Sequence, residues 1–426
     1  MSSDELVGRF SIGDLIKAGV ISAHKDGNFG SLYPRLEDFG KNGLPLLTAK
    51  VVNAGRIDFG AAQKLRKEKA ACLPYGFIQA GDVLLSHNAT VGRVAVVPEF
   101  SGQALIGTSL TYFRLDASRL LPRYLAGFFE SRDFQNQLAG VMGLSTRNQV
   151  PITAQRLLEV EVPPLKVQHR ISEFIGALDD RIALLRETNA TLEDIAQALF
   201  KSWFVDFDPV RAKSQGLAPA GMDEAPAALF PQGFEESGLA LRPRGWQVGK
   251  VEDLLDLAYG KALKATDRAA GEVPVYGSGG IVGYHNEPLV SGPGVVVGRK
   301  GSIGTLYWES RPFFPIDTVF FVRPKLPLTF CFHQLAVLGL QGMNTDGAVP
   351  GLNRNNVYRL QVIIPPRAVL DAFDDVVSAL RAKMVSNEAH SETLTTLRDT
   401  LLPRLISGQL RLPQAEEAIA EAIHAD

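Results

Sequence analysis

Two adjacent prolines open the stretch that decides the fold of this chain, which reads PPLKVQHRISEFIGALDDRIALLRETNATLEDIAQALFKSW from Pro163 to Trp203. After the prolines, apolar residues recur in alternating steps of four and three. This heptad spacing predicts a long helix that pairs with another helix, and a buried polar residue such as Asn189 can fix the register of that pairing. The seam consists of Ile171, Ile175, Leu178, Ile182, Leu185, Asn189, Leu192, Ala196, Leu199 and Trp203.

The same pattern occurs a second time. Pro365-Pro366 follows Pro163-Pro164 at an offset of 202 residues, and the helical pattern after it matches the first without a gap. The two helices could each pack on their own globular domain, but their equal length and strict heptads favour pairing with each other. The residues expected to form this pairing are Leu178, Ile182, Leu185, Asn189, Leu192, Leu199, Leu380, Met384, Leu394 and Leu401. In the second helix, Arg398 interrupts the apolar seam.

A globular domain is expected before each helix. Short β-branched or aromatic runs bounded by turn residues, such as 294–298 and 318–322, predict strands. We therefore expect an α+β fold, in which two mixed α/β domains and two long helices form an internal repeat. The expected segments are 1–164 (first domain), 165–206 (first helix), 207–243 (extended linker), 244–366 (second domain), 367–409 (second helix) and 410–426 (tail).

Each domain also contains short polar segments that recur in the other. Thr90-Val91-Gly92 matches Ser302-Ile303-Gly304, and the run 147–150 (RNQV) matches 354–357 (RNNV). Arg and Asn can each form two hydrogen bonds with a base, whereas Ser and Thr position phosphates. Asn and Gly are also common in turns for conformational reasons, but recurrence in both copies favours a DNA-binding role. The candidate DNA-binding residues are Lys50, His87, Asn88, Thr90, Arg93, Ser145, Thr146, Arg147, Asn148, Lys261, Tyr276, Ser278, Arg299, Lys300, Ser302, Asn353, Arg354 and Asn355.

The distribution of charge agrees with two separate DNA contacts. The whole chain has 44 Lys and Arg against 46 Asp and Glu, a net charge of −2, which excludes a uniformly basic DNA-binding protein. However, residues 1–164 carry 18 basic and 15 acidic residues, and residues 244–366 carry 12 and 9. Each domain is therefore at +3, and the helices, linker and tail hold the excess of negative charge.

Motifs for catalysis or cofactor binding are absent from the sequence. Residues 294–300 lack the spacing of a phosphate-binding loop, and 277–283 lacks that of a dinucleotide loop. The 7 His residues and 2 Cys residues show no metal-ligand spacing. No signal peptide or apolar membrane span is evident, so we expect a cytoplasmic protein that binds no cofactor, metal or membrane.

These features resemble the DNA-specificity subunit of type I restriction-modification systems. The segment ALFKSWFVDFDPV (198–210) resembles the end of that family's central conserved helix, and LLPRLISGQL (401–410) its C-terminal counterpart. The segments YGSGGI (276–281) and GRKGSIG (298–304) resemble a frequent form of its second recognition domain. The likeness covers essentially the whole chain and is weakest in the first domain.

The resemblance implies a non-catalytic subunit with two target recognition domains, each of which reads half of a bipartite DNA site, and two antiparallel helices that set the gap. Two methyltransferase subunits would bring S-adenosylmethionine for adenine methylation, and a restriction/translocase subunit would bring ATP and Mg²⁺. Two alternatives remain open: a bivalent DNA-binding regulator without enzyme partners, and the recognition part of a self-sufficient modification enzyme separated from its catalytic region.

Overall fold

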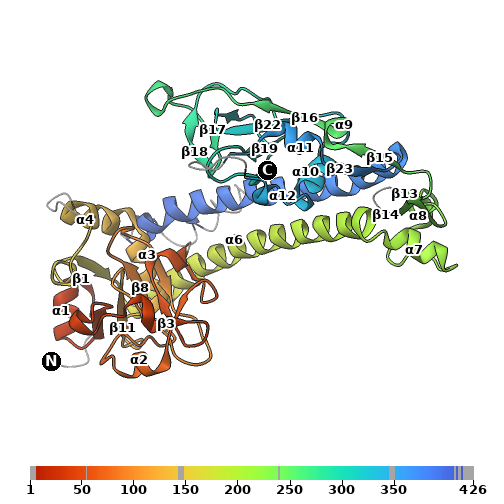
Figure 1. The fold of residues 1–426 in the computed structure, drawn as a ribbon. Helices are drawn as coiled ribbons and strands as arrows, with labels where there is room; N and C mark the ends of the chain where they lie inside the picture. The colour runs from red at the N-terminus through yellow and green to blue at the C-terminus, as the bar shows by residue number, and fades with distance from the viewer. Residues whose placement is uncertain are drawn as a thin grey trace. The chain divides into compact units, whose positions relative to one another are not determined.

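A computed structural model describes residues 6–53, 55–142, 148–237, 240–344, 351–406, 409–410 and 414–415 (Figure 1). The chain divides into two compact units. Unit 1 comprises 1–184 and 390–426, and unit 2 comprises 185–389. The division cuts both long helices, α6 (Leu165–Phe200) and α12 (Arg367–Ile406), so each unit contains one globular domain and a part of each helix.

Unit 1 contains a mixed α/β domain. Its central sheet has the strand order β2-β11-β8-β9, and a second sheet has the order β10-β4-β7-β3. Helix α3 packs on β8 and β9. The elements are β1 (Gly8–Ser11), α1 (Ile12–Lys17), β2 (Ile21–Asp26), η1 (Gly30–Leu32), η2 (Leu36–Asp38), β3 (Phe39–Gly40), β4 (Leu44–Leu47), η3 (Ala49–Val51), β5 (Val52–Asn53), β6 (Arg56–Ile57), β7 (Gln63–Leu65), α2 (Lys67–Ala71), β8 (Val83–Ser86), β9 (Val94–Val96), β10 (Leu105–Ile106), β11 (Leu110–Leu115), α3 (Pro122–Glu130), α4 (Arg132–Met142), α5 (Ile152–Gln155) and β12 (Glu159–Val162).

Unit 2 contains the second domain. Its central sheet has the order β16-β22-β19-β20, beside a smaller sheet of order β18-β17-β21. The elements before α12 are β13 (Phe234–Ser237), β14 (Ala240–Pro243), β15 (Gln247–Lys250), α9 (Val251–Leu254), β16 (Leu255–Tyr259), η5 (Ala265–Asp267), β17 (Val273–Gly277), β18 (Gly280–His285), β19 (Gly294–Gly298), β20 (Leu306–Glu309), β21 (Phe314–Pro315), β22 (Val319–Pro324), α10 (Leu328–Val337), η6 (Leu340–Gly342), α11 (Arg354–Tyr358) and β23 (Gln361–Ile364).

The two domains share one topology, which confirms the predicted α+β fold and its internal repeat. In unit 1, β2 pairs with β11, and β11 also pairs with β8, the first strand of the β8–β9 hairpin. In unit 2, β16 pairs with β22, and β22 also pairs with β19, the first strand of the β19–β20 hairpin. The turn that follows β8 is equivalent to the turn that follows β19, because Gly92 N donates to Ser86 O (2.9 Å) and Gly304 N donates to Gly298 O (2.8 Å). This equivalence agrees with the sequence match of 90–92 to 302–304.

The second sequence match is wrong in register. Val150 N donates to His87 O and Leu352 N donates to Arg299 O, both at 2.8 Å, and His87 and Arg299 hold equivalent positions after β8 and β19. Val150 is therefore equivalent to Leu352, at the same offset of 202 that relates the helices, and 147–150 is not equivalent to 354–357. The similarity between RNQV and RNNV therefore does not mark equivalent positions in the two domains.

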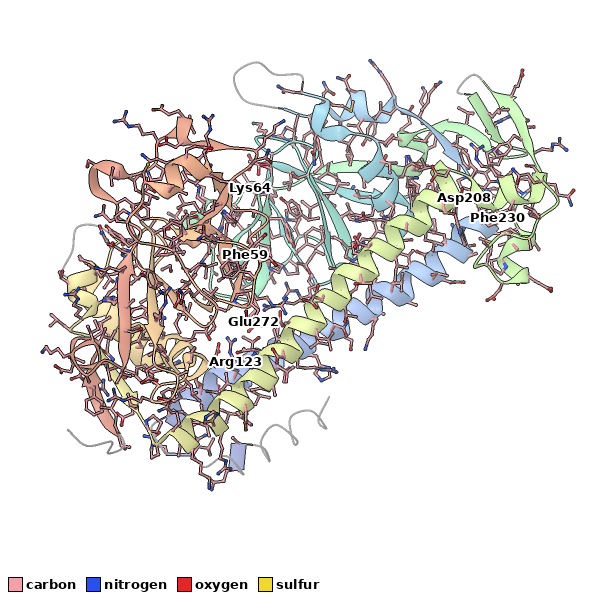
Figure 2. The ribbon with its side chains drawn as sticks, turned by 90° about the horizontal axis from the view of Figure 1, so that it is seen from below. Phe59, Lys64, Arg123, Asp208, Phe230 and Glu272 are labelled. Atoms are coloured by element: carbon pink, nitrogen blue, oxygen red, sulfur yellow. The ribbon has the colours of Figure 1, made fainter. Side chains whose placement is uncertain are left out.

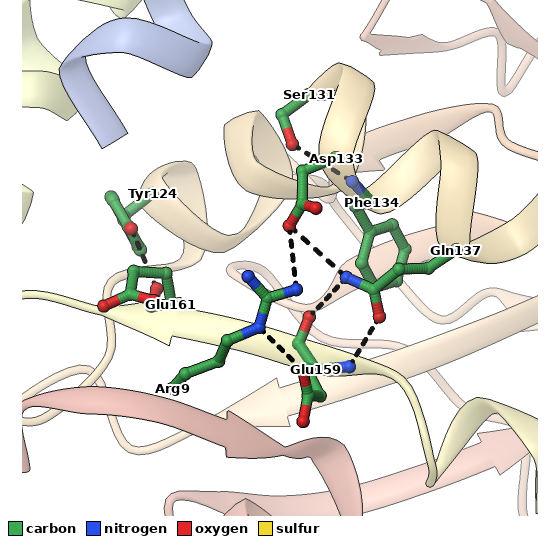
Figure 3. A network of polar contacts seen from close by, with 8 residues as sticks. All are labelled: Arg9, Tyr124, Ser131, Asp133, Phe134, Gln137, Glu159 and Glu161. Atoms are coloured by element: carbon green, nitrogen blue, oxygen red, sulfur yellow. Dashed lines mark hydrogen bonds and ion pairs between the residues drawn. The ribbon is translucent and has the colours of Figure 1, made fainter. Parts of the chain in front are cut away.

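A strand pair precedes each long helix. Strand β1 pairs with β12 directly before α6, and β15 pairs with β23 directly before α12. In unit 1, Arg9 on β1 donates to Glu159 on β12 (2.7 Å) and to Asp133 on α4 (3.2 Å), while Gln137 on α4 bonds the backbone of Glu159 (Figure 3). These partners are half exposed, so the ion pairs contribute little alone, and the backbone pairing is the main constraint on the start of α6.

The two long helices contact each other inside each unit. In unit 2, Asn387 Nδ2 donates to Asn189 Oδ1 (2.8 Å), Asn189 Nδ2 donates to Met384 O (2.9 Å), and Arg381 pairs with Glu193 (2.7 Å). As the residue number rises along α6, the residue number of the partner on α12 falls, so the two helices are antiparallel. In unit 1, Arg398 bonds Asp179 (2.8 Å), which explains its place in the apolar seam.

The expected pairing residues line these contacts. Leu178, Ile182, Leu185, Leu394 and Leu401 are buried, whereas Asn189, Leu192, Leu199, Leu380 and Met384 are half buried.

The prediction of an extended linker at 207–243 is wrong, because the described residues of this range, 207–237 and 240–243, form secondary structure that belongs to unit 2. A π-helical turn, η4 (Lys201–Val205), ends α6 and is followed by α7 (Asp208–Ser214), α8 (Glu224–Ala228) and the β13–β14 hairpin. Phe207 adopts a left-handed conformation at the turn into α7 (φ 55°). Phe230 from this segment packs against Trp203 and Trp246 in the core of unit 2. Buried aromatic side chains hold the segment in place. The Pro and Gly residues of the segment had indicated an extended linker.

Candidate DNA interface

The turn after β19 positions the main cationic cluster of unit 2. A Cβ on Gly298 would lie 2.0 Å from Ser302 O, so only glycine permits the turn to fold back so tightly. Arg299 N and Lys300 N both donate to Thr318 O, at 3.0 and 3.1 Å. The backbone of the turn is thereby fixed against the start of β22, with Arg299 half buried and Lys300 exposed.

Two arginines from distant segments meet on one tyrosine. The guanidinium carbons of Arg299 and Arg354 lie 5.2 and 4.8 Å from the ring centroid of Tyr259, at the end of β16. Arg299 also lies 5.8 Å from the ring of Phe320, and its Nε and Nη2 donate to Asp317 O (3.1 and 2.7 Å). Cation–π contacts of this kind hold guanidinium groups in place while their outer edges stay available to a ligand.

The other predicted residues of unit 2 surround this cluster at different depths. Lys261, Lys300, Ser302, Asn353 and Asn355 are exposed, and Ser278 and Arg354 are half buried. Asn353 caps α11, since its Oδ1 accepts from Asn355 N at 2.9 Å. Ser278 Oγ donates to Lys300 O, which ties the β17–β18 turn to the cationic turn. The structure thus brings most of these residues to one surface.

Two predicted DNA-binding residues, one in each unit, are buried. Tyr276 is 6% exposed, and its hydroxyl donates to Glu309 Oε2 at 3.0 Å. Burial and the Glu309 carboxylate raise the pKa of Tyr276. His87, the equivalent of Arg299 in unit 1, is 2% exposed, and burial lowers its pKa. Neither ring can reach a base or a phosphate in this conformation, because each side chain points into a domain core.

The predicted residues of unit 1 form a smaller group. Arg93 Nη1 donates to Ala49 O (2.9 Å) and Val52 O (3.0 Å), and so holds the η3 segment that presents the exposed Lys50. Asn88 is half buried and bridges to Gln149, and Thr90 and Asn148 are exposed nearby in the chain. Ser145, Thr146 and Arg147 lie outside the described residues.

Sequence reasoning missed two features. The first is Tyr259, which is 50% exposed. The sequence feature that could have indicated it is an aromatic residue at the end of a strand, directly before Gly260-Lys261. In unit 1, Lys41, Lys64, Arg66 and Lys67 are exposed around the β3–β7 pair, where Gly40 is in register with Lys64 (Figure 2 labels Lys64). The run of cations at 64–69 was the signal for this basic edge.

Other classes of site find little support in the part of the chain that is described. Within those residues, no group of three or more His, Cys, Asp or Glu is placed to hold a metal ion. Among the same residues, no helix has both the length and the apolar character needed to cross a membrane.

The chain matches known proteins along most of its length. The model of the family described as "Type I restriction modification DNA specificity domain" matches residues 49–194 and 243–380. The type I restriction enzyme HindI specificity subunit of Haemophilus influenzae is 25% identical over 401 residues, which cover 78% of this chain and 87% of the relative. The MjaIX specificity subunit of Methanocaldococcus jannaschii is 21% identical over 414 residues, which cover 89% and 90%.

A solved structure shares the fold. The type I restriction-modification S subunit from M. genitalium aligns over 95% of this chain and 97% of its own, with a TM-score of 0.50 and 17% identity. The family model alone covers well over half of the chain, in one segment of each half. The chain therefore belongs to the family of type I restriction-modification DNA specificity domains and carries two copies of the domain.

Proposed function

We propose that this chain is the sequence-specific DNA-binding specificity subunit of a type I restriction-modification complex. Each domain reads one half of a bipartite site and so directs adenine methylation and restriction by partner subunits. The observation that carries the proposal is the Arg299–Tyr259–Arg354 cluster, in which the tyrosine is exposed and the arginines are half buried, on a domain that matches the specificity family. The chain contributes recognition, and its partners contribute catalysis.

In unit 2, Arg299 and Arg354 are the proposed base-reading residues. Arginine binds guanine with two hydrogen bonds in the major groove, and the contacts with Tyr259 reduce the entropy that each side chain loses on binding. Lys261 and Lys300 are exposed beside them and contact phosphates. In unit 1, Lys50 and the exposed basic edge of Lys41, Lys64, Arg66 and Lys67 contribute phosphate contacts.

A groove in unit 2 is the proposed docking site for a methyltransferase subunit. Its volume is about 920 Å³, and it lies between the end of α6, the linker helices α7 and α8, and the start of α12. The lining is largely apolar and includes Trp203, Leu229 and Val376. The exposed carboxylates of Asp208, Asp223 and Asp375 also line it (Figure 2 labels Asp208). An apolar partner segment flanked by lysine or arginine would complement this groove.

The partner subunits are proposed to supply the chemistry. Two methyltransferase subunits would bind S-adenosylmethionine, and a restriction/translocase subunit would bind ATP and Mg²⁺. This chain would hold none of these cofactors.

Mapping of methylated adenines in the host genome tests the function. Deletion of the gene for this chain should abolish methylation at one bipartite motif, and the chain should co-purify with a methyltransferase subunit. Persistence of every methylated motif after deletion would contradict the proposal. Tight DNA binding by the purified chain alone, with no methyltransferase partner, would instead indicate a regulator.

Substitution of the cluster tests the assignment of the site. Arg354→Ala should weaken binding to the half-site read by unit 2 by about 10-fold or more, since a bidentate contact contributes about 1–3 kcal/mol of discrimination. Lys300→Ala should weaken binding to all sequences alike and reduce the dependence on salt. Arg359→Ala, an exposed arginine on the same segment, serves as the control and should have little effect.

A further inference from the structure

Beside the cationic cluster, the β17–β18 hairpin exposes apolar side chains. Strand β18 is an edge strand, with Ile281 and Val282 44% and 46% exposed. Nearly half of each side chain is therefore open to solvent. Exposed β-branched residues on an edge strand favour unwanted association, and a ligand that covers them would offset this risk.

Val282 belongs to a small apolar surface next to the cations. A Cβ on Gly277 would lie 3.2 Å from Val282 Cγ1, 3.6 Å from Ile316 Cδ1 and 3.6 Å from Thr318 Oγ1. The tips of these three side chains therefore converge above Gly277. We call Val282 and Ile316 the apolar step. Because the carbonyl of Thr318 accepts the amides of both Arg299 and Lys300, the apolar step adjoins the cationic turn directly.

The charge around the apolar step favours an anionic ligand. Lys261 N donates to Pro315 O at 3.0 Å, which places an exposed lysine next to Ile316, and the exposed Lys300 is bonded through its amide to Thr318 O. Arg268 Nη1 donates to Val282 O at 2.6 Å, and Asp267 and Asp317 are exposed carboxylates nearby in the chain. A two-stranded ribbon fits the major groove of DNA, where thymine presents a C5-methyl group, the one apolar group on a base edge.

We propose that the apolar step packs on the C5-methyl group of a thymine in the half-site read by unit 2, with Val282 as a specificity-determining residue. This inference rests on the proposed DNA-recognition function. It adds that part of the discrimination comes from an apolar contact, which cytosine, guanine and adenine cannot provide, and not from hydrogen bonds alone.

Uracil provides the test, because it lacks the methyl group and keeps the hydrogen-bonding edge of thymine. In the complex with its methyltransferase subunits, each thymine of the mapped half-site is replaced by uracil in turn, and the dissociation constant is measured. At one position, we expect binding to weaken about fourfold, the effect of exposing one buried methyl-sized group. Val282→Thr keeps the β-branched shape and should remove most of this uracil penalty.

Ile281→Thr is the matched control. Ile281 has nearly the same exposure on the same strand but points to the opposite face, so this variant should keep the full penalty. The inference is overturned if no uracil replacement weakens binding, or if Val282→Thr retains the penalty. Loss of co-purifying methyltransferase in Val282→Thr with an unchanged penalty would also overturn it, since the surface would then face a protein. A complex that binds no bipartite DNA at all would overturn the proposed function as well.

Discussion

At the scale of single residues, Tyr259 organises the proposed site of unit 2. Its ring contacts the guanidinium groups of Arg299 and Arg354, which come from a turn and from α11. We expect Tyr259→Ala to weaken DNA binding by about 10-fold, because two cation–π contacts of roughly 0.5–1 kcal/mol each are lost. Tyr259→Phe keeps the ring and should bind nearly as well as the wild type.

Competition binding with half-site variants measures this effect. The loss in Tyr259→Ala should be confined to discrimination at the half-site read by unit 2. Tyr33→Ala, which removes an exposed tyrosine from unit 1, is the control and should preserve that discrimination. Equal binding by Tyr259→Ala and the wild type would show that the ring does not organise the arginines.

A second residue-scale prediction concerns acid stability. His24 stacks on Phe113, its Nε2 bonds Gln155 Oε1 at 3.1 Å, and its Nδ1 is buried without a partner. Burial lowers the pKa of His24 from 6.5 to about 4. The unfolded chain therefore binds a proton more readily than the folded chain between these values. The stability that the neutral ring contributes is complete above pH 6.5 and is lost as the pH falls towards 4.

Hydrogen-exchange pulse labelling in urea, read on peptides that cover β2, measures the stability of this region. We expect a loss of up to about 3 kcal/mol between pH 7 and pH 4, from the linkage of the two pKa values. His24→Phe should reduce this dependence and leave the part due to the buried His87, whereas His169→Gln, a change at an exposed histidine, should not alter it. An unchanged pH profile in His24→Phe would assign the acid sensitivity to other groups.

At the scale of elements, the paired helices are the proposed ruler between half-sites. The antiparallel pair is held in register by Asn189 and Asn387, so a change in length must be made in both helices. Insertion of one heptad after Leu184 in α6 and another after Ala389 in α12 keeps the apolar seam in phase. Seven residues add about 10 Å of helix, which corresponds to roughly three base pairs.

Methylation sequencing of cells that carry the insertion variant reads the gap directly. We expect both half-sites to keep their sequence and the gap between them to lengthen. The same heptad inserted after Gly216, in the turn that follows α7, is the control and should leave the gap unchanged. A gap of the original length in the double insertion would refute the ruler.

At the scale of the whole molecule, assembly depends on the proposed docking groove. Val376 is 44% exposed and lines the groove, so Val376→Asp adds charge where an apolar partner segment would pack. We expect this variant to lose most of the co-purifying methyltransferase. Val385→Asp is the matched control, because Val385 is 40% exposed on the same helix and does not line the groove. Equal recovery of the methyltransferase by both variants would place its docking site elsewhere.

The sequence by itself determined the repeat, the two long helices and the strands of both domains. These features repeat along the chain at fixed periods, and the heptad seam and the strand runs depend on near neighbours. The sequence also placed Arg299, Lys300 and Arg354 among the candidates. The sequence wrongly indicated an extended linker, because the few aromatic residues that anchor this segment, such as Phe230, are buried by contacts with segments far along the chain.

Only the tertiary structure decided which polar residues reach the surface. His87 and Arg299 hold equivalent positions, yet the histidine is buried in its domain and the arginine is stacked on an exposed tyrosine. Register alone does not set that difference, because the two positions are equivalent. It follows from the segments packed around each position, which in unit 2 include the ring of Tyr259. The Arg299–Tyr259–Arg354 cluster joins the end of β16, the turn after β19 and α11, which are close in the folded domain and distant in the chain. Their proximity follows from long-range pairing, for which a single sequence has no local signal.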